Sequence, residues 1–100
     1  MRVDKSYPAE TSLAIGETFT PCSSTFPVIL LACSLLRSDG LRPVWAVLCL
    51  IPHNTLHPFG VWNATSRDDG WHLESGDYRS DLLSAVTSYE VRAGNNFHPD

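Results

Sequence analysis

The sequence has few of the features that mark nucleic-acid binding, membrane insertion or secretion. Only seven of its 100 residues are Lys or Arg, and the formal net charge is −4. A nucleic-acid-binding domain normally carries a basic patch, so we expect no nucleic-acid partner. The apolar runs are shorter than the ~18 residues that a transmembrane helix needs, and no short basic segment precedes them as in a signal peptide. We therefore expect no membrane association.

Cysteine is scarce, and catalytic motifs are missing. Cys22, Cys33 and Cys49 are an odd count with no motif spacing, which argues against a disulfide framework and for a reducing compartment. A cytoplasmic location follows as an expectation. No nucleophile elbow or phosphate-binding loop occurs, so no catalytic residue and no cofactor are predicted. We interpret four glycines as turns or helix caps: Gly60, Gly70, Gly76 and Gly94.

Two long apolar runs, residues 27–36 and 44–51, dominate what is present. A polar hexapeptide with Asp39-Gly40 at its centre separates them, which predicts a buried β-hairpin with a two-residue turn. That turn would place Cys33 opposite Ala46. A helix over residues 26–36 is the alternative, because Pro27 is typical of a first helical turn and the run is apolar on all sides.

The rest of the chain predicts two more strands and one helix in a single α+β domain over residues 1–100. Residues 1–11 and 95–100 are expected to be weakly ordered, and residues 12–20 to form a short strand or strap held by Leu13, Ile15 and Phe19. The expected architecture is an antiparallel meander of three to four strands followed by a C-terminal helix. The strands are expected at about 26–37, 43–51, 58–66 and 70–75, and the helix at about 80–93.

The predicted helix has a clear beginning, apolar stripe and end. Ser80 is the expected N-cap, Arg92 lies in the last turn, and Gly94 or Asn95 can take the left-handed cap. The apolar side chains that recur at helical spacing make one stripe. They are Leu82, Leu83, Val86, Tyr89 and Ala93.

Both central runs are apolar at odd and even positions alike, so both faces of the sheet need cover. The helix can cover one face, whereas the segment around residues 13–19 is thin cover for the other. This imbalance predicts a homodimer, or a contact with another protein, over the second face.

Histidines and acidic residues supply the remaining candidates. His53 and His57 are four residues apart, and His72 or Cys49 would complete a zinc site. Because the pair lies in a loop between two prolines, we favour packing against strands and predict no metal. His72 also pairs on paper with Asp69 or with Asp77, and Cys22 is the candidate for a reactive thiol.

An acidic stretch with interleaved aromatic residues predicts an interaction edge, since aromatic anchors are common in interfaces. A solvated turn next to a helix start is the alternative. Trp45 and Trp62 lie inside strands and are expected in the core. The predicted interaction residues are Asp68, Asp69, Trp71, Glu74, Asp77 and Tyr78.

Residues 42–92 resemble small uncharacterised proteins of actinobacteria and their phages. The resemblance rests on Arg42-Pro-Val-Trp-Ala-Val-Leu, His57-Pro-Phe-Gly-Val-Trp62, Gly70-Trp71, Gly76-Asp-Tyr78 and Asp81-Leu-Leu-Ser-Ala-Val86. It implies a prokaryotic or phage cytoplasm and a small accessory role, and it provides no activity that could be transferred to this chain.

The sequence predicts a non-enzymatic accessory protein that acts through protein–protein contacts. In its sharper form, this is a phage-type inhibitor or modulator of a host or defence protein. The alternative is a small enzyme or ligand-binding domain with a pocket near His57, His72 and Tyr78.

Overall fold

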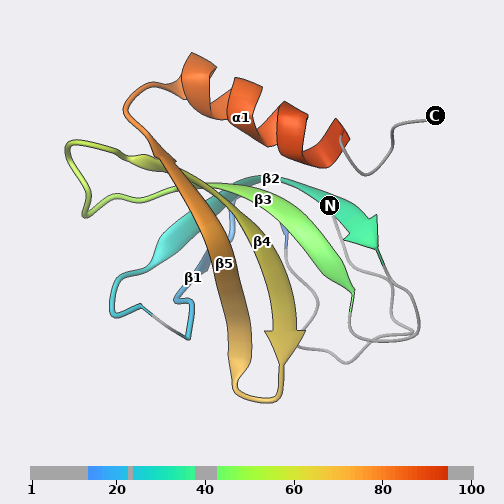
Figure 1. Ribbon diagram of the computed structural model, residues 1–100. Coiled ribbons are helices and arrows are strands. Elements are labelled where there is room, and N and C mark those ends of the chain that lie inside the picture. The colour runs from blue at the N-terminus through green and yellow to red at the C-terminus, as the bar shows by residue number, and fades with distance from the viewer. Residues whose placement is uncertain (1–13, 23, 38–42, 95–100) are drawn as a thin grey trace.

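The computed structural model describes residues 14–22, 24–37 and 43–94, which form five strands and one helix (Figure 1). The strands follow one another in the sheet in chain order, and every neighbouring pair is antiparallel. The sheet curves into a half-barrel, and the helix lies across its convex side. The elements are β1 (Thr18–Phe19), β2 (Val28–Arg37), β3 (Val44–Leu50), β4 (Phe59–Arg67), β5 (Gly70–Arg79) and α1 (Leu82–Gly94).

The predicted α+β meander with a C-terminal helix is confirmed, and β1 adds a fifth strand at its edge. The strand at 70–75 is longer than expected, because β5 continues to Arg79. The predictions for the Asp39-Gly40 turn, for Leu13 and for both chain ends concern residues outside those that the structure describes.

Residues 28–37 form a strand and not the alternative helix. Cys33 pairs with Val47 rather than with Ala46, so the register predicted from a two-residue turn is wrong. The offset is already present next to the turn, where Arg37 pairs with Val44 although a two-residue turn would pair it with Arg42, and the irregularity between Leu35 and Arg37 leaves Cys33 one residue out of the predicted register. Each extra residue shifts the pairing and changes which face the following side chains occupy.

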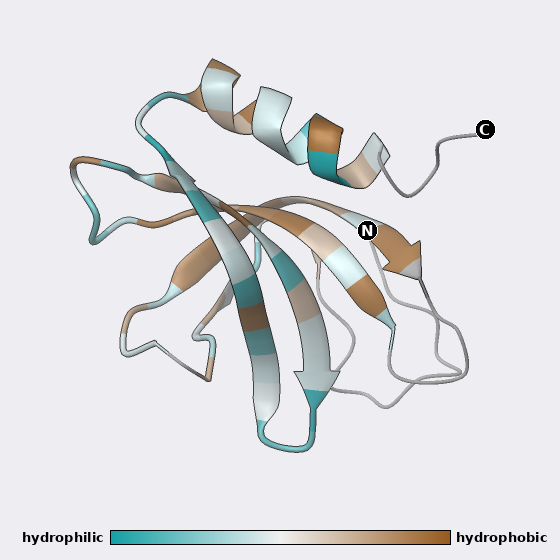
Figure 2. Cartoon of the chain, viewed as in Figure 1, coloured by the Kyte–Doolittle hydropathy of each residue, from teal (hydrophilic) through white to brown (hydrophobic). Residues whose placement is uncertain are grey.

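The concave side of the half-barrel holds the larger core. Trp45 and Trp62 are confirmed as core residues, whereas Trp71, predicted as an exposed anchor, is also buried, with 8 % of its surface exposed. Apolar residues gather on β2 and β3, whereas β4 and β5 are largely polar or neutral (Figure 2). The buried members of this cluster are Val28, Leu30, Trp45, Val47, Cys49, Ile51, Trp62, Ala64 and Trp71.

Within the part of the chain that the structure describes, curvature buries this face without a second sheet or a helix over it. The side chains at the centre of β3, Trp45, Val47 and Cys49, are at most 5 % exposed within a single chain. Because the strands wrap around their own large side chains, the argument that this face lacks cover does not hold. The homodimer predicted from that argument stays a prediction.

Gly60 and Gly76 lie inside β4 and β5, so their interpretation as turn residues is wrong. A Cβ atom at either position would collide with the indole of Trp62. The two glycines therefore make room for this ring on the concave face. Gly70, in contrast, has φ +123° beside the β4–β5 turn, where the backbone conformation favours glycine.

Helix α1 packs on the convex face through Ala85, which is fully buried, and through Val86, Tyr89 and Ala93. Leu83 does not belong to the buried stripe, because it lies about 200° from Ala85 around the helix. Leu82, in the first turn, is also half exposed.

The N-cap of α1 is Asp81 rather than Ser80. Its Oδ2 accepts a hydrogen bond from the Ser84 N–H at 2.9 Å, which satisfies one of the free amide donors of the first turn. Arg92 lies in the last turn as predicted. Among the described residues, no helix is long and apolar enough to cross a bilayer.

Candidate functional site

The two edges of the half-barrel come together next to the β4–β5 turn. The Cys22 N–H donates to the Trp71 carbonyl oxygen at 2.9 Å, and the rings of Phe19 and Trp71 lie 6.5 Å apart. These contacts tie the chain that follows β1 to β5. The segment between β1 and β2 is therefore held across the concave side.

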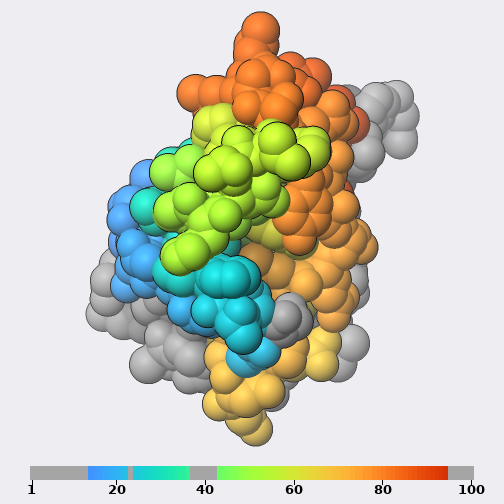
Figure 3. Space-filling model, turned by 90° about the vertical axis from the view of Figure 1, so that its left-hand side faces the viewer, coloured from blue at the N-terminus to red at the C-terminus, as the bar shows by residue number. Residues whose placement is uncertain are grey.

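A cavity of about 500 Å³ opens on the concave side beneath this segment. Three parts of the chain meet around it: the segment before β2, the β3–β4 loop and the far end of β5 (Figure 3). Its volume falls within the range typical of small-molecule sites, which often occupy the mouths of β-barrels. The lining residues are Pro21, Ser24, Phe26, Val28, Ile51, His53, Asn54, Thr55, Leu56, Trp62, Leu73 and Tyr78.

Aromatic side chains build the walls of the cavity. Trp62 and Tyr78 meet edge to face, with ring centroids 5.4 Å apart and planes at 84°. The rings of Phe26 and His53 lie 4.6 Å apart on the opposing segments. Ring pairs at these separations add to the stability gained from burial alone, so the walls have a defined shape.

The mouth of the cavity is apolar and exposed. Phe26 and Tyr78 are each 50 % exposed and Leu56 is 76 % exposed, although side chains of this kind normally find cover. The three lie on three different segments of the chain that converge on one opening. An exposed apolar cluster of this kind marks a binding surface more often than scattered apolar residues do.

Five of the lining residues carry a polar side chain, and local bonds hold two of them, Asn54 and Ser24, in place. Asn54 Oδ1 accepts the His57 N–H at 2.9 Å, and Ser24 Oγ accepts the Phe26 N–H at 3.0 Å. None of the described lining residues is Asp, Glu, Lys or Arg. The imidazole of His53 and the hydroxyls of Thr55 and Tyr78 are the other polar groups of the lining that can orient a ligand.

The predicted pocket trio is only partly brought together. Tyr78 lines the cavity, whereas His57 is exposed in the β3–β4 loop and His72 lies beside the β4–β5 turn. Two lining residues, Phe26 and Leu56, were not predicted as site residues. Sequence patterns gave no reason to expect them there, because a lone apolar residue beside proline or in a loop is normally interpreted as local packing.

The six predicted interaction residues do not share one surface. Trp71 and Tyr78 belong to the concave side, whereas Asp77 lies beneath α1, where it bonds Arg79 and Ser88. Glu74 forms an exposed ion pair of 3.5 Å with an arginine of β4. Asp68 lies in the β4–β5 turn.

A second hollow, of about 710 Å³, lies between α1 and β5 and is largely polar. Arg79 donates to Asp77 at 2.8 Å, and the Ser88 hydroxyl donates to the same carboxylate. The bond from Arg79, followed by that from Ser88, lowers the pKa of Asp77. Because these groups already form hydrogen bonds with one another, this hollow is better explained as a helix–sheet joint than as a binding site.

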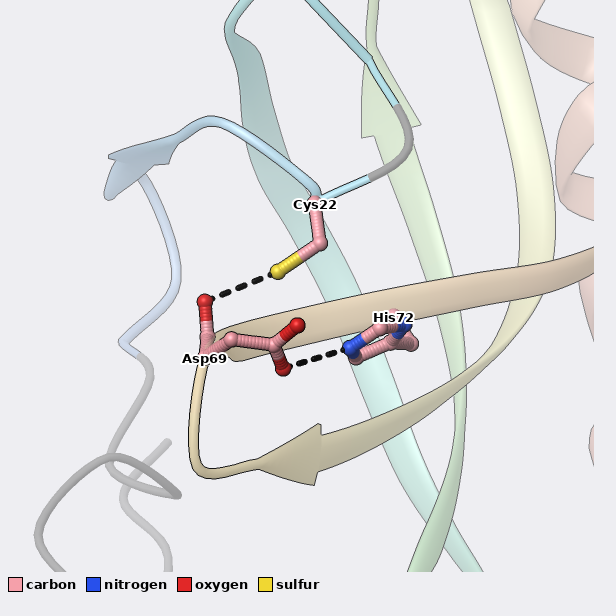
Figure 4. Close-up of side chains that lie close together, drawn as sticks. All are labelled: Cys22, Asp69 and His72. Carbon is pink, nitrogen blue, oxygen red and sulfur yellow. Dashed lines mark hydrogen bonds and ion pairs between the residues drawn. The ribbon is translucent and has the colours of Figure 1, made fainter.

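Asp69 lies in a cluster with Cys22 and His72 at the β4–β5 turn (Figure 4). The His72 Nε2–H donates to Asp69 Oδ1 at 2.7 Å, and the Cys22 thiol donates to the Asp69 carbonyl oxygen at 2.9 Å. Partial burial, followed by the nearby Asp69, raises the pKa of Cys22. A thiol held neutral in this way is not an activated nucleophile.

The described residues contain one cluster of three or more potential metal ligands, and neither His53 nor His57 belongs to it. The alternative zinc site built on those two histidines is therefore not assembled. Comparison with family models, with curated proteins and with solved structures gives no match to this chain.

Proposed function

We propose that the protein is a binding module that takes a small, mainly apolar ligand into the concave cavity. The observation that carries the proposal is the apolar ring of Phe26, Leu56 and Tyr78 around an opening of about 500 Å³. Burying these exposed side chains against an apolar ligand would stabilise the complex by about 25 cal/mol per Å² removed from water, before the costs of association.

The lining also favours one chemical class of ligand. Without Asp, Glu, Lys or Arg among its described lining residues, the cavity offers no ion-pair partner for a charged group. An ionised group would lose hydration there with no fixed charge of opposite sign to compensate. The preferred ligand is therefore uncharged and aromatic or aliphatic, with one polar group within reach of His53 or Tyr78.

The test is binding of the neutral dye N-phenyl-1-naphthylamine, followed by dye fluorescence. We expect saturable binding of one dye per chain. Leu56→Asp should weaken it at least about tenfold, which corresponds to about 1.4 kcal/mol, because the dye would desolvate the new carboxylate. Leu83→Asp is the matched control, since both leucines are 76 % exposed and Leu83 lies on α1. Equal affinity in the two variants would rule out the cavity as the site.

A protein–protein contact is the second candidate. Leu83 and Val91, about two turns apart on α1, are 76 % and 58 % exposed and point away from the buried Ala85. An apolar helix face of this kind suits a second copy of the chain. A solution mass near twice 11.1 kDa that falls to the monomer value in Leu83→Asp would support the homodimer, whereas a wild-type monomer would exclude it.

The accessory role implied by the phage and actinobacterial resemblance stays a prediction, as does a host or defence protein as the partner. The cytoplasmic location also stays a prediction. It is supported by the three free thiols, Cys22, Cys33 and Cys49, because disulfides form mainly in oxidising compartments.

A further inference from the structure

Two distant parts of the chain bring three metal-ligating side chains together at the β4–β5 turn. Cys22 follows β1, Asp69 lies in the turn and His72 is near the start of β5. Their potential ligand atoms all lie within 4.8 Å of one another. None of the three lines the concave cavity, so this cluster is separate from the proposed ligand site.

We propose that Cys22, Asp69 and His72 form a binding site for a zinc-class divalent cation. Thiolate and imidazole are ligands that zinc, cobalt and related metals prefer, whereas magnesium and calcium prefer oxygen. One thiolate, one carboxylate and one neutral imidazole supply two negative charges, which balance a divalent cation. Three protein ligands leave the fourth position of a tetrahedral site to water.

The distances fit a site that closes slightly around an ion. In tetrahedral zinc sites, ligand atoms lie about 3.3–3.6 Å apart, given metal–ligand bonds of about 2.0–2.3 Å. Nε2 of His72 and Oδ1 of Asp69, now 2.7 Å apart, would separate by about half an ångström to admit the ion, as these bond lengths require. The Asp69 side chain is 68 % exposed and has room to turn. On binding, the Cys22 thiol would release its proton to solvent, and the proton of His72 would move from Nε2 to Nδ1 so that Nε2 can bind the ion.

The position of the cluster gives the ion a structural effect. Cys22 and Trp71 already share the backbone hydrogen bond that ties the chain after β1 to β5. Asp69 and His72 flank Trp71 and Gly70 in sequence. A metal held by all three ligands would add a second link between the two edges of the half-barrel, so binding should stabilise the fold.

The test is titration of reduced, untagged protein with Co²⁺, followed by the thiolate-to-metal charge-transfer absorption and by thermal unfolding. We expect one Co²⁺ per chain, loss of the absorption when Zn²⁺ displaces it, and a melting temperature that rises with either metal. Cys22→Ser and His72→Ala should each weaken binding by more than about 100-fold, beyond the losses typical of groups behind the ligands.

Cys33→Ser and His57→Ala are the matched controls, because each removes a residue of the same type outside the cluster. Both should keep the absorption and the metal-dependent rise in melting temperature. The proposal is overturned if wild-type protein shows no charge-transfer absorption with Co²⁺. It is equally overturned if Cys22→Ser binds Co²⁺ as tightly as wild type does.

Discussion

The two faces of the sheet are buried by opposite means. Among the described residues, no helix or second sheet covers the concave face, which is filled by large side chains, including Trp45, Trp62 and Trp71. The convex face is covered by α1, and its contact with the helix includes two fully buried alanines, Ala46 and Ala85. Small side chains let a helix approach a sheet closely, whereas a curved sheet must fill its own interior.

The faces also differ in their polar contacts. On the convex side, side-chain hydrogen bonds link the sheet to α1: Ser34 to Tyr89, Asp77 to Ser88 and Asn63 to Arg92. On the concave side, aromatic contacts dominate, and the incompletely filled end becomes the cavity. The concave face therefore has a cavity with aromatic walls, whereas the hollow on the convex face is lined by polar groups that hold the helix.

Removing a concave tryptophan should have the largest effect on stability. We expect Trp71→Ala to lower the free energy of unfolding by about 3–5 kcal/mol, because it removes transfer energy and leaves a cavity. Urea unfolding measures the loss. Leu83→Ala is the control and should stay within about 0.5 kcal/mol. A loss below about 1 kcal/mol for Trp71→Ala would place this side chain outside the core and make it available again as a partner anchor.

Enlarging a convex alanine tests the tight joint, with an intermediate effect expected. Ala85 is fully buried against Leu48 and Val61, so Ala85→Leu should cost about 1–3 kcal/mol through overpacking. Glu90→Leu introduces the same side chain on the exposed side of α1 and should change stability by no more than about 0.5 kcal/mol. Thermal unfolding of the pair gives the comparison. Equal stability would mean that α1 is not closely packed at Ala85.

Much of the fold was predictable because its signals are local. The apolar run at 44–51, the strand propensity around it and the amphipathic segment near residues 80–93 each fixed an element type. The register of β2 against β3 was not predictable, since Arg37 already pairs with Val44 beside the turn and irregularities at Leu36 and Leu31 shift the pairing again along β2. Ser80 was predicted as the N-cap in place of Asp81, because both residue types are good N-caps and the sequence alone does not decide between neighbours.

The sites were harder to predict because they join distant segments. The pairing of His72 with Asp69 was considered from sequence. Cys22, however, is 47 residues from Asp69 in the chain, and only the closure of the half-barrel brings the two together. Similarly, Gly60 and Gly76 were interpreted as turn residues because the Trp62 ring comes to lie against both of them only once the strands pair in the sheet. A tryptophan flanked by strand glycines is the signal that would have suggested this arrangement.

The smallest effect is expected for the polar contacts under α1. The pKa of Asp77 is lowered by hydrogen bonds from Arg79 and Ser88, so its unfolded-state pKa, about 3.9, is the higher of the two. The stabilisation is thus fully present above about pH 4 and is lost as the pH falls through the folded-state pKa. The Arg79 and Asp77 side chains are 42 % and 33 % exposed. Solvent screening therefore limits the stabilisation from the ionised Asp77 to about 1 kcal/mol or less.

We therefore expect Asp77→Asn to be slightly less stable than wild type at pH 7 and equal to it near pH 2, as measured by urea unfolding across this range. Glu90→Gln, on the exposed side of α1, is the control and should not reproduce this pattern. A difference that stays constant down to pH 2 would show that Asp77 acts through shape and neutral hydrogen bonds. The ionised carboxylate would then add nothing to the convex face, and the contrast between the two faces would reduce to the size of their side chains and their neutral hydrogen bonds.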